Sequence, residues 1–309
     1  MQPLDTAWLL THLRCPQCDA PALVADGSDL VCRTCGRRYP VVAGICNFVL
    51  PEQLGPTAQQ EIRAINSYLN DQVKRQNLMH RDQHGLLLAH FLRRSVRIAA
   101  RYLAPYATAG RTLCALGCGG GFDLLSLAQF VRFERIVAGD ISTAATACIG
   151  ENLAAQTGRL GLLACEFQRC PVRRSPDMVG FIFEALHHTA DVHQTIEQLL
   201  AQNFDRLVFV EPTRNWLTDL LAQWALTLNV EYSGLTPDWI HLRKVRAIAR
   251  RMGYHMAATT WWPYPDRLVP RWIKCSARLT RGFCRLVDIA SWLTAPFHFG
   301  AMSAVHLWK

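Results

Sequence analysis

The chain has 309 residues, half of them hydrophobic and 18% charged, so its composition excludes a disordered protein and allows one large domain with a smaller one. The formal net charge is +9, but residues 241–309 hold twelve Lys or Arg against two Asp, so a near-neutral body carries a basic end. Nothing in the sequence predicts a secretory signal. Nothing predicts a membrane span either, because the most apolar stretch, residues 289–308, is interrupted by proline, histidine and glycine. We expect a cytoplasmic protein, with peripheral association at a membrane left open.

The first feature along the chain is a pair of CxxC motifs, Cys15 with Cys18 and Cys32 with Cys35. In a reducing compartment such pairs favour a metal site over a disulfide. Two CxxC turns supply the four thiolates of a tetrahedral zinc site, and because no position stays open, that Zn²⁺ would be structural. The alternative is a chance pairing or a redox dithiol.

The segment around these cysteines resembles the short zinc ribbon at the front of some bacterial methyltransferases, including the 23S rRNA guanine-N1 family. It also resembles the small eukaryotic partner protein that activates tRNA and protein methyltransferases. The matching features are "LRCPQC", "CRTCGRRYPV" and "GICNFV". The resemblance implies that residues 1–52 are a zinc ribbon placed before a companion enzyme.

After the linker-like "PEQLGP", residues 57–104 lack proline and carry apolar residues at helical spacing. This pattern predicts two or three helices, and we place a helical connector or lid over residues 53–109. The last of these helices carries four arginines, which predicts a solvated face, with a substrate-facing role as the alternative: Arg93, Arg94, Arg97 and Arg101.

The stretch "LCALGCGGGFD", residues 113–123, reads as a buried strand, a glycine turn and the start of a helix. Together these elements predict a site for a nucleotide cofactor. The glycines do not follow the GxGxxG order and no Gly-Lys-Ser/Thr follows, which disfavours a dinucleotide site and a P-loop. What remains is GxGxG, with Gly117, Gly119 and Gly121, where bare backbone permits close approach.

Further strands follow at regular distances. "RIVAGDIS" ends in Asp140, whose carboxylate can accept hydrogen bonds from a ribose diol, although Asp140 could instead cap the next helix. "GLLACEF" ends a third strand at Glu166 and Phe167, and for Glu166 the alternative is an ordinary surface acid. Residues 170–191 predict a loop, a fourth strand and a turn, and "RLVFVEP" is a fifth strand with Glu211 near its end.

These ordered segments resemble class I S-adenosylmethionine-dependent methyltransferases. The resemblance implies an α/β fold: a Rossmann-like, mainly parallel, seven-stranded domain over residues 110–309, with an insertion near 264–296. It also implies that S-adenosyl-L-methionine binds six residues of the turn and the strand ends: Gly117, Gly119, Gly121, Asp140, Glu166 and Phe167.

The sequence departs from that family at one important position. Ala115 stands two residues before the first glycine, where the family usually carries an acid, and Asp123 is a candidate substitute. The departure keeps open a catalytically degenerate binding or activator protein with the same fold.

The turn after the fourth strand holds His187 and His188, our candidate catalytic residues. A neutral imidazole can act as a general base or line the acceptor pocket, and the alternative is a packed, hydrogen-bonded turn. We favour pocket lining, because methyl transfer from a sulfonium needs mainly alignment. The acceptor would lie near these residues and Glu211, beneath a lid made by the helices at 57–104 and the insertion.

In the C-terminal part we expect a helix at 241–254, a strand at 255–262 and a final strand at 303–309. Between the strands, five basic residues recur at helical spacing and predict one basic stripe: Arg271, Lys274, Arg278, Arg281 and Arg285. The stripe could meet an anionic membrane surface, an RNA backbone or an acidic substrate, or be the solvated side of a packed lid. We expect a small-molecule or lipid-like methyl acceptor, because the histidine pair and the aromatic, apolar C-terminal end resemble small-molecule methyltransferases. An RNA base is the runner-up, which the ribbon and the basic end favour although the ribbon itself is neutral.

Overall fold

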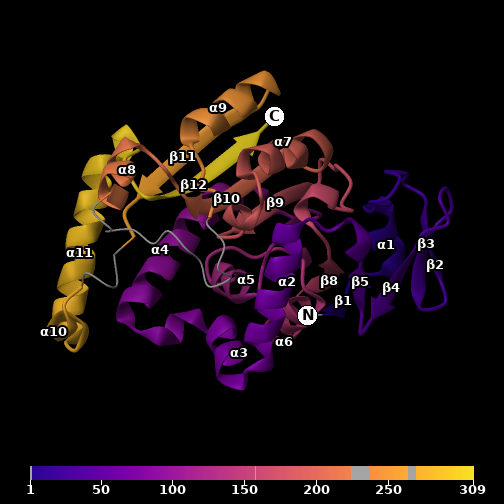
Figure 1. Cartoon of the computed structure of the whole chain (residues 1–309), viewed down its shortest axis with the longest axis horizontal. Coiled ribbons are helices and arrows are strands. Elements are labelled where there is room, and N and C mark those ends of the chain that lie inside the picture. The colour runs from indigo at the N-terminus through magenta and orange to yellow at the C-terminus, as the bar shows by residue number, and fades with distance from the viewer. Residues whose placement is uncertain (1, 157, 224–236, 264–268) are drawn as a thin grey trace.

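A computed structural model describes residues 2–156, 158–223, 237–263 and 269–309 (Figure 1). Its centre is a seven-stranded sheet in the order β8-β7-β6-β9-β10-β12-β11, which confirms the predicted α/β fold. Among these strands β12 is antiparallel to both of its neighbours and the other described pairs are parallel. The strands are β6 (Thr112–Leu116), β7 (Arg135–Asp140), β8 (Arg159–Ala164), β9 (Met178–Phe183), β10 (Arg206–Pro212), β11 (His255–Trp261) and β12 (Met302–Trp308).

The central strands are apolar throughout because helices cover both faces of the sheet. Along β6, Leu113 and Ala115 point to one face, and Cys114 and Leu116 point to the other. The first face packs against α4 (Leu86–Leu103), α5 (Phe122–Leu127) and α6 (Thr143–Leu153). The second face packs against α7 (Val192–Gln202) and α9 (Leu242–Arg251).

The N-terminal segment joins this sheet at its β8 edge. It contains β1 (Gln2–Pro3), α1 (Thr6–Thr11), β2 (Leu23–Asp26), β3 (Asp29–Cys32), β4 (Arg38–Val42), β5 (Ile45–Asn47) and the 3-10 turn η1 (Pro51–Gln53). Both β1 and β5 pair in parallel with β8. Phe48 is buried in the same core cluster as Leu163 of β8, so the N-terminal segment shares a hydrophobic core with the following domain.

The predicted helices between residues 57 and 104 are present as α2 (Pro56–Asn70), α3 (Gln72–Met79) and α4, with the 3-10 turns η2 (Arg81–His84) and η3 (Ala104–Tyr106). Proline at the start of α2 is well tolerated because the first N–H groups of a helix have no partner within it. Leu92, Val96 and Leu103 of α4 are fully buried on the sheet. Helix α4 is therefore a core helix, whereas α2 and α3 lie over the strand ends.

The C-terminal region contains α8 (Trp216–Gln223), α10 (Arg271–Lys274), α11 (Ala277–Thr294) and η6 (Ala295–Phe297). The predicted basic stripe is not continuous, since α10 ends before Ser276, whose hydroxyl caps α11, and the five basic residues are divided between two helices. Helix α11 packs on α4, where Arg94 lies 2.5 Å from the Asp288 carboxylate. Arg94 is thus not on a solvated face, and residues 264–268 of the expected insertion lie outside the described residues.

Candidate functional site

A cavity of about 750 Å³ opens at the carboxyl ends of the central parallel strands. This is the edge where open α/β sheets bind ligands, and the volume suits a small molecule. One wall comes from α2, α3 and η2, and the other from the turns that follow β6, β7, β8 and β9. No described residue of 269–296 lines the cavity, so this described part of the insertion contributes nothing to the cavity wall.

The glycine turn after β6 forms the floor of the cavity. Gly117, Gly119 and Gly121 have φ of +68°, +49° and +78°, conformations that side chains rarely adopt. A Cβ on Gly117 would lie 2.5 Å from the Ala185 Cβ, so this position is closed to any larger residue. Gly117 and Gly119 line the cavity, whereas Gly121 lies behind it, where its backbone packs closely on Ile149 of α6.

Asp140 joins the glycine turn to the next strand. Its carboxylate accepts hydrogen bonds from the Gly119 N–H at 2.9 Å and the Ser142 N–H at 3.1 Å. The helix cap is Ser142, whose hydroxyl accepts from the Ala145 N–H, so the capping alternative for Asp140 is wrong. Burial raises the pKa of Asp140 above its ordinary value. Asp140 lines the cavity and holds the turn in place.

Glu166 and Phe167 follow β8 and both line the cavity. Burial raises the pKa of Glu166, which separates it from an ordinary surface acid. The Phe167 ring lies against the glycine turn, with its Cζ 2.8 Å from where a Cβ on Gly117 would stand. The structure therefore brings an acid and an aromatic ring to the cavity wall beside the Asp140 strand end.

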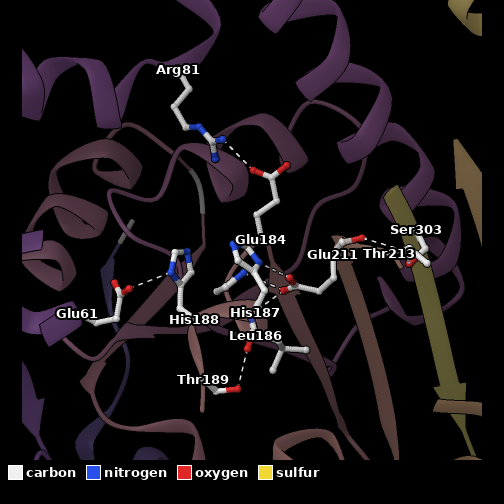
Figure 2. Close-up of polar contacts among 11 residues, drawn as sticks. Glu61, Arg81, Glu184, Leu186, His187, His188, Thr189, Glu211, Thr213 and Ser303 are labelled. Atoms are coloured by element: carbon white, nitrogen blue, oxygen red, sulfur yellow. Dashed lines mark hydrogen bonds and ion pairs between the residues drawn. The ribbon is translucent and has the colours of Figure 1, made fainter. Parts of the chain in front are cut away.

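His187 is held from behind by a buried carboxylate (Figure 2). Its Nδ1 lies 2.6 Å from Oε2 of Glu211, and Oε1 of Glu211 accepts from the backbone N–H groups of Ala185 and Leu186. An ionised carboxylate can only accept hydrogen bonds, so we assign the proton of this contact to Nδ1 of His187. Glu211 is fully buried and does not line the cavity, so it positions the turn and the imidazole and is not placed to contact an acceptor.

His188 points to the opposite wall (Figure 2). Its Nδ1 lies 3.0 Å from Oε1 of Glu61 on α2. The rings of His187 and His188 are 4.2 Å apart between centroids. Both histidines line the cavity, and the Glu61 contact ties α2 across its mouth.

The cavity contains three further charged residues. The sequence suggests no role for Arg81 and Glu184, and it suggests Asp123 only as a substitute for the acid missing at Ala115. Arg81 of η2 donates to Glu184 at 2.8 Å, and Glu184 follows β9 with a left-handed φ of +50° (Figure 2). Their separation of 103 residues leaves no local sequence signal for the pair. Asp123 at the start of α5 is buried, which raises its pKa to about 7. Ala115 faces the α4 side of the sheet and does not line the cavity.

The described lining of the cavity is strongly acidic. It contains five carboxylates and Arg81 as its single Lys or Arg: Glu61, Asp123, Asp140, Glu166 and Glu184 are the acids. Carboxylates concentrated in a partly buried cavity favour a ligand that carries positive charge.

A four-cysteine cluster lies in the N-terminal segment, away from the cavity. The Sγ atoms of Cys15, Cys18, Cys32 and Cys35 all lie within 4.8 Å of one another, with 3.7 Å between Cys15 and Cys35 and 3.6 Å between Cys18 and Cys32. Tetrahedral zinc with Zn–S bonds of about 2.3 Å requires about 3.8 Å between sulfurs, so the cluster fits Zn²⁺. The Tyr39 hydroxyl lies 3.0 Å from the Cys15 sulfur, where it can donate to a thiolate.

Fold and site together define the class: a mixed α/β sheet of the methyltransferase fold with an N-terminal four-cysteine cluster. One similar solved structure is magnesium protoporphyrin IX methyltransferase from Synechocystis PCC 6803 with bound S-adenosylmethionine, at 12% identity and a TM-score of 0.50, covering 83% of this chain and 99% of that one. Another comes from the complex between the Haloferax volcanii Trm112 methyltransferase activator and a methyltransferase, at 16% identity and a TM-score of 0.50, covering 79% and 96%. No protein-family model and no curated protein matches the sequence.

Proposed function

We propose that the protein is an S-adenosylmethionine-dependent methyltransferase that acts on a small-molecule or lipid-like acceptor. The observation that carries the proposal is the acidic cavity at the strand ends, with five carboxylates against one arginine. S-adenosylmethionine supplies an electrophilic methyl group on a positively charged sulfonium. A cavity of this charge and volume suits such a cofactor.

Each predicted cofactor residue has a distinct task in this proposal. Gly117 and Gly119 present bare backbone to the methionine part, while Gly121 allows α5 and α6 to pack closely. Asp140 keeps acceptor capacity for a ribose diol because each of its oxygens uses one lone pair on a backbone N–H. Glu166 and Phe167 would hold the adenine by a hydrogen bond and ring contact. Asp123 and Glu184 supply the carboxylates that Ala115 does not.

The acceptor would lie against His187 and His188, between the strand ends and α2. With its Nδ1 proton directed at Glu211, His187 presents the other ring nitrogen as an acceptor that can orient or deprotonate a nucleophile. His188, tied to Glu61, would align the acceptor and help exclude water. For both histidines we favour lining the pocket and aligning the acceptor over true base catalysis, because in-line displacement at a methyl group depends mainly on geometry.

The charge of the cavity also separates the acceptor classes. An RNA base would have to bring its phosphates to a cavity whose described lining holds five carboxylates and one arginine, which is unfavourable. A neutral or cationic small acceptor meets no such repulsion. The apolar residues among the lining, such as Ile65, Leu78 and Leu88, favour an acceptor with a hydrocarbon part.

We further propose that residues 1–52 form a zinc ribbon whose Zn²⁺ is structural, that 53–109 connect it to the catalytic domain, and that 110–309 form that domain. Four thiolates complete the tetrahedral shell and leave no position for a reacting group. The pairing of β5 with β8 supports a role for the ribbon in stabilising the sheet edge that carries Glu166.

The test is isothermal titration of S-adenosylmethionine and S-adenosylhomocysteine into the zinc-loaded full-length protein. We expect micromolar binding, weakened at least about tenfold in Asp140→Asn and in Glu166→Gln, since each removes a charge-assisted hydrogen bond. Asp177→Asn is the matched control, because this acid is exposed and distant from the cavity lining. A folded wild type that binds neither ligand overturns the proposal in favour of a degenerate binding or activator protein.

A further inference from the structure

Helix α11 has a buried face that packs on the protein and an apolar line of side chains that points away from it. Thr280, Cys284 and Ser291 are buried where the helix packs on the protein. Leu279, Leu286 and Leu293 recur every seven residues along the opposite side, and all three are exposed. A seven-residue repeat keeps side chains in one line along a helix. This line has no cover among the described residues.

The exposed apolar surface extends beyond the leucines. Ile289 lies beside them, and Trp292 is 74% exposed near the end of the helix. Phe297 is 66% exposed in η6, and its ring stacks on Phe299, whose ring meets Trp216 of α8. We call this surface, from Leu279 to Phe297 with Trp216, the α11 patch. Exposed aromatic and aliphatic residues gathered in this way mark an interaction site.

A row of arginines runs beside the patch. Arg278 and Arg285 each precede a leucine of the line by one residue, which places them about 100° around the helix from it. Arg281 lies between them, and all three are exposed without an ion-pair partner in the described part of the chain. Asp288, the one acid of α11, is turned inward to Arg94. The outward side of α11 is therefore apolar and cationic.

We propose that the α11 patch docks on the surface of an anionic lipid bilayer, with α11 lying in the plane of the interface. Leucine, isoleucine and tryptophan would enter the boundary between headgroups and acyl chains, while the arginines would contact anionic headgroups. An RNA backbone satisfies the arginines but offers nothing to a line of leucines, so lipid fits better. Among the described residues, every helix is too short or too polar to span a bilayer.

The position of the patch permits such docking. Helices α10 and α11 lie at the end of the molecule opposite the N-terminal strands β2 and β3 (Figure 1). The patch could thus meet a flat surface without contact from the four-cysteine cluster. This inference does not depend on the proposed methyl transfer, because lipid binding is measured without turnover.

The experiment is cosedimentation of the full-length protein with vesicles of phosphatidylcholine alone, or with about one third phosphatidylglycerol. We expect binding to the anionic vesicles, weakened by salt. R278Q/R281Q/R285Q should weaken it about fivefold for each arginine, and Leu286→Ser with Ile289→Ser by about tenfold or more. The matched control, R243Q/R246Q/R250Q on α9, removes the same charge from exposed positions without an outward apolar line and should bind like wild type.

A second measurement locates the contact. Lipid brominated on its acyl chains should quench wild-type tryptophan fluorescence, and Trp292→Phe should remove a measurable part of the quenching. Four results overturn the proposal. Two concern vesicles: the folded wild type does not bind anionic vesicles, or the α9 control loses as much vesicle binding as R278Q/R281Q/R285Q. The other two are binding of RNA in place of vesicles, and self-association that the Leu286 and Ile289 substitutions abolish while vesicles are not bound. Circular dichroism establishes that each variant is folded.

Discussion

Replacing Asp123 by asparagine should stabilise the protein at neutral and alkaline pH. Asp123 is buried at the cavity floor, and burial is the main cause that raises its pKa to about 7. A hydrogen bond from its own backbone N–H and attraction from Arg81 oppose the rise, and repulsion by Glu184 and Asp140 adds to it. An acid whose pKa rises on folding costs nothing below its unfolded value of 3.8. Its cost grows as the pH rises and is complete above about pH 7. A shift from 3.8 to about 7 corresponds to about 4 kcal/mol.

The assay is denaturant unfolding of Asp123→Asn and wild type, both loaded with zinc, at several pH values between about 4 and 8.5. The difference in unfolding free energy isolates this one group, since distant titrations cancel. It should be near zero at the acid end and favour Asp123→Asn increasingly up to about pH 7. Asp177→Asn, at an exposed position, should differ little from wild type at any pH. A destabilised Asp123→Asn, or a difference independent of pH, would refute the reasoning.

The remaining predictions concern the other buried contacts. Glu211→Ala should lower the unfolding free energy by about 3–5 kcal/mol, because three donors lose a buried carboxylate. Glu211→Gln should lower it by less. Equal and small losses of unfolding free energy in both variants, measured by denaturant unfolding, would contradict this reasoning. Cys32→Ser should reduce bound zinc, counted by elemental analysis, whereas Cys46→Ser, a buried cysteine outside the cluster, should keep it. Once an acceptor is found, His188→Ala and Glu61→Ala should slow turnover by similar factors. The double variant should lose little more than either single variant, since both substitutions remove the same hydrogen bond, and fully additive losses would contradict the shared role.

Several site residues could be predicted from the sequence because their signals are local. The two CxxC motifs each place two sulfurs on one tight turn, and only the meeting of the two turns needed the fold. The GxGxG turn depends on conformations that glycine adopts without strain, and Asp140 stands at a strand end that hydrophobicity alone delimits. Such features can be predicted without the tertiary contacts, because they depend only on residues that are close in the sequence.

Other parts could not be predicted, because they depend on segments far apart in the chain. Arg94 looks like part of a solvated basic face until α11 supplies Asp288 from 194 residues away. Glu211 looks like a candidate for the acceptor pocket, but its carboxylate turns back onto the Ala185–His187 turn and is fully buried. The basic stripe divides at Ser276, whose hydroxyl accepts from the Leu279 N–H and so begins a new helix there.

The sequence by itself determined the alternation of strands and helices, the glycine turn, the thiolate quartet and the basic end, because periodicity, backbone freedom and residue chemistry act over a few neighbours. The tertiary structure alone decided that Glu61 and Glu184 join the cavity lining, that Glu61 reaches His188 and Arg81 reaches Glu184, and that α11 turns a line of leucines outward. The two contacts join residues 127 and 103 positions apart, and only the packing of the sheet and its helices brings such residues together.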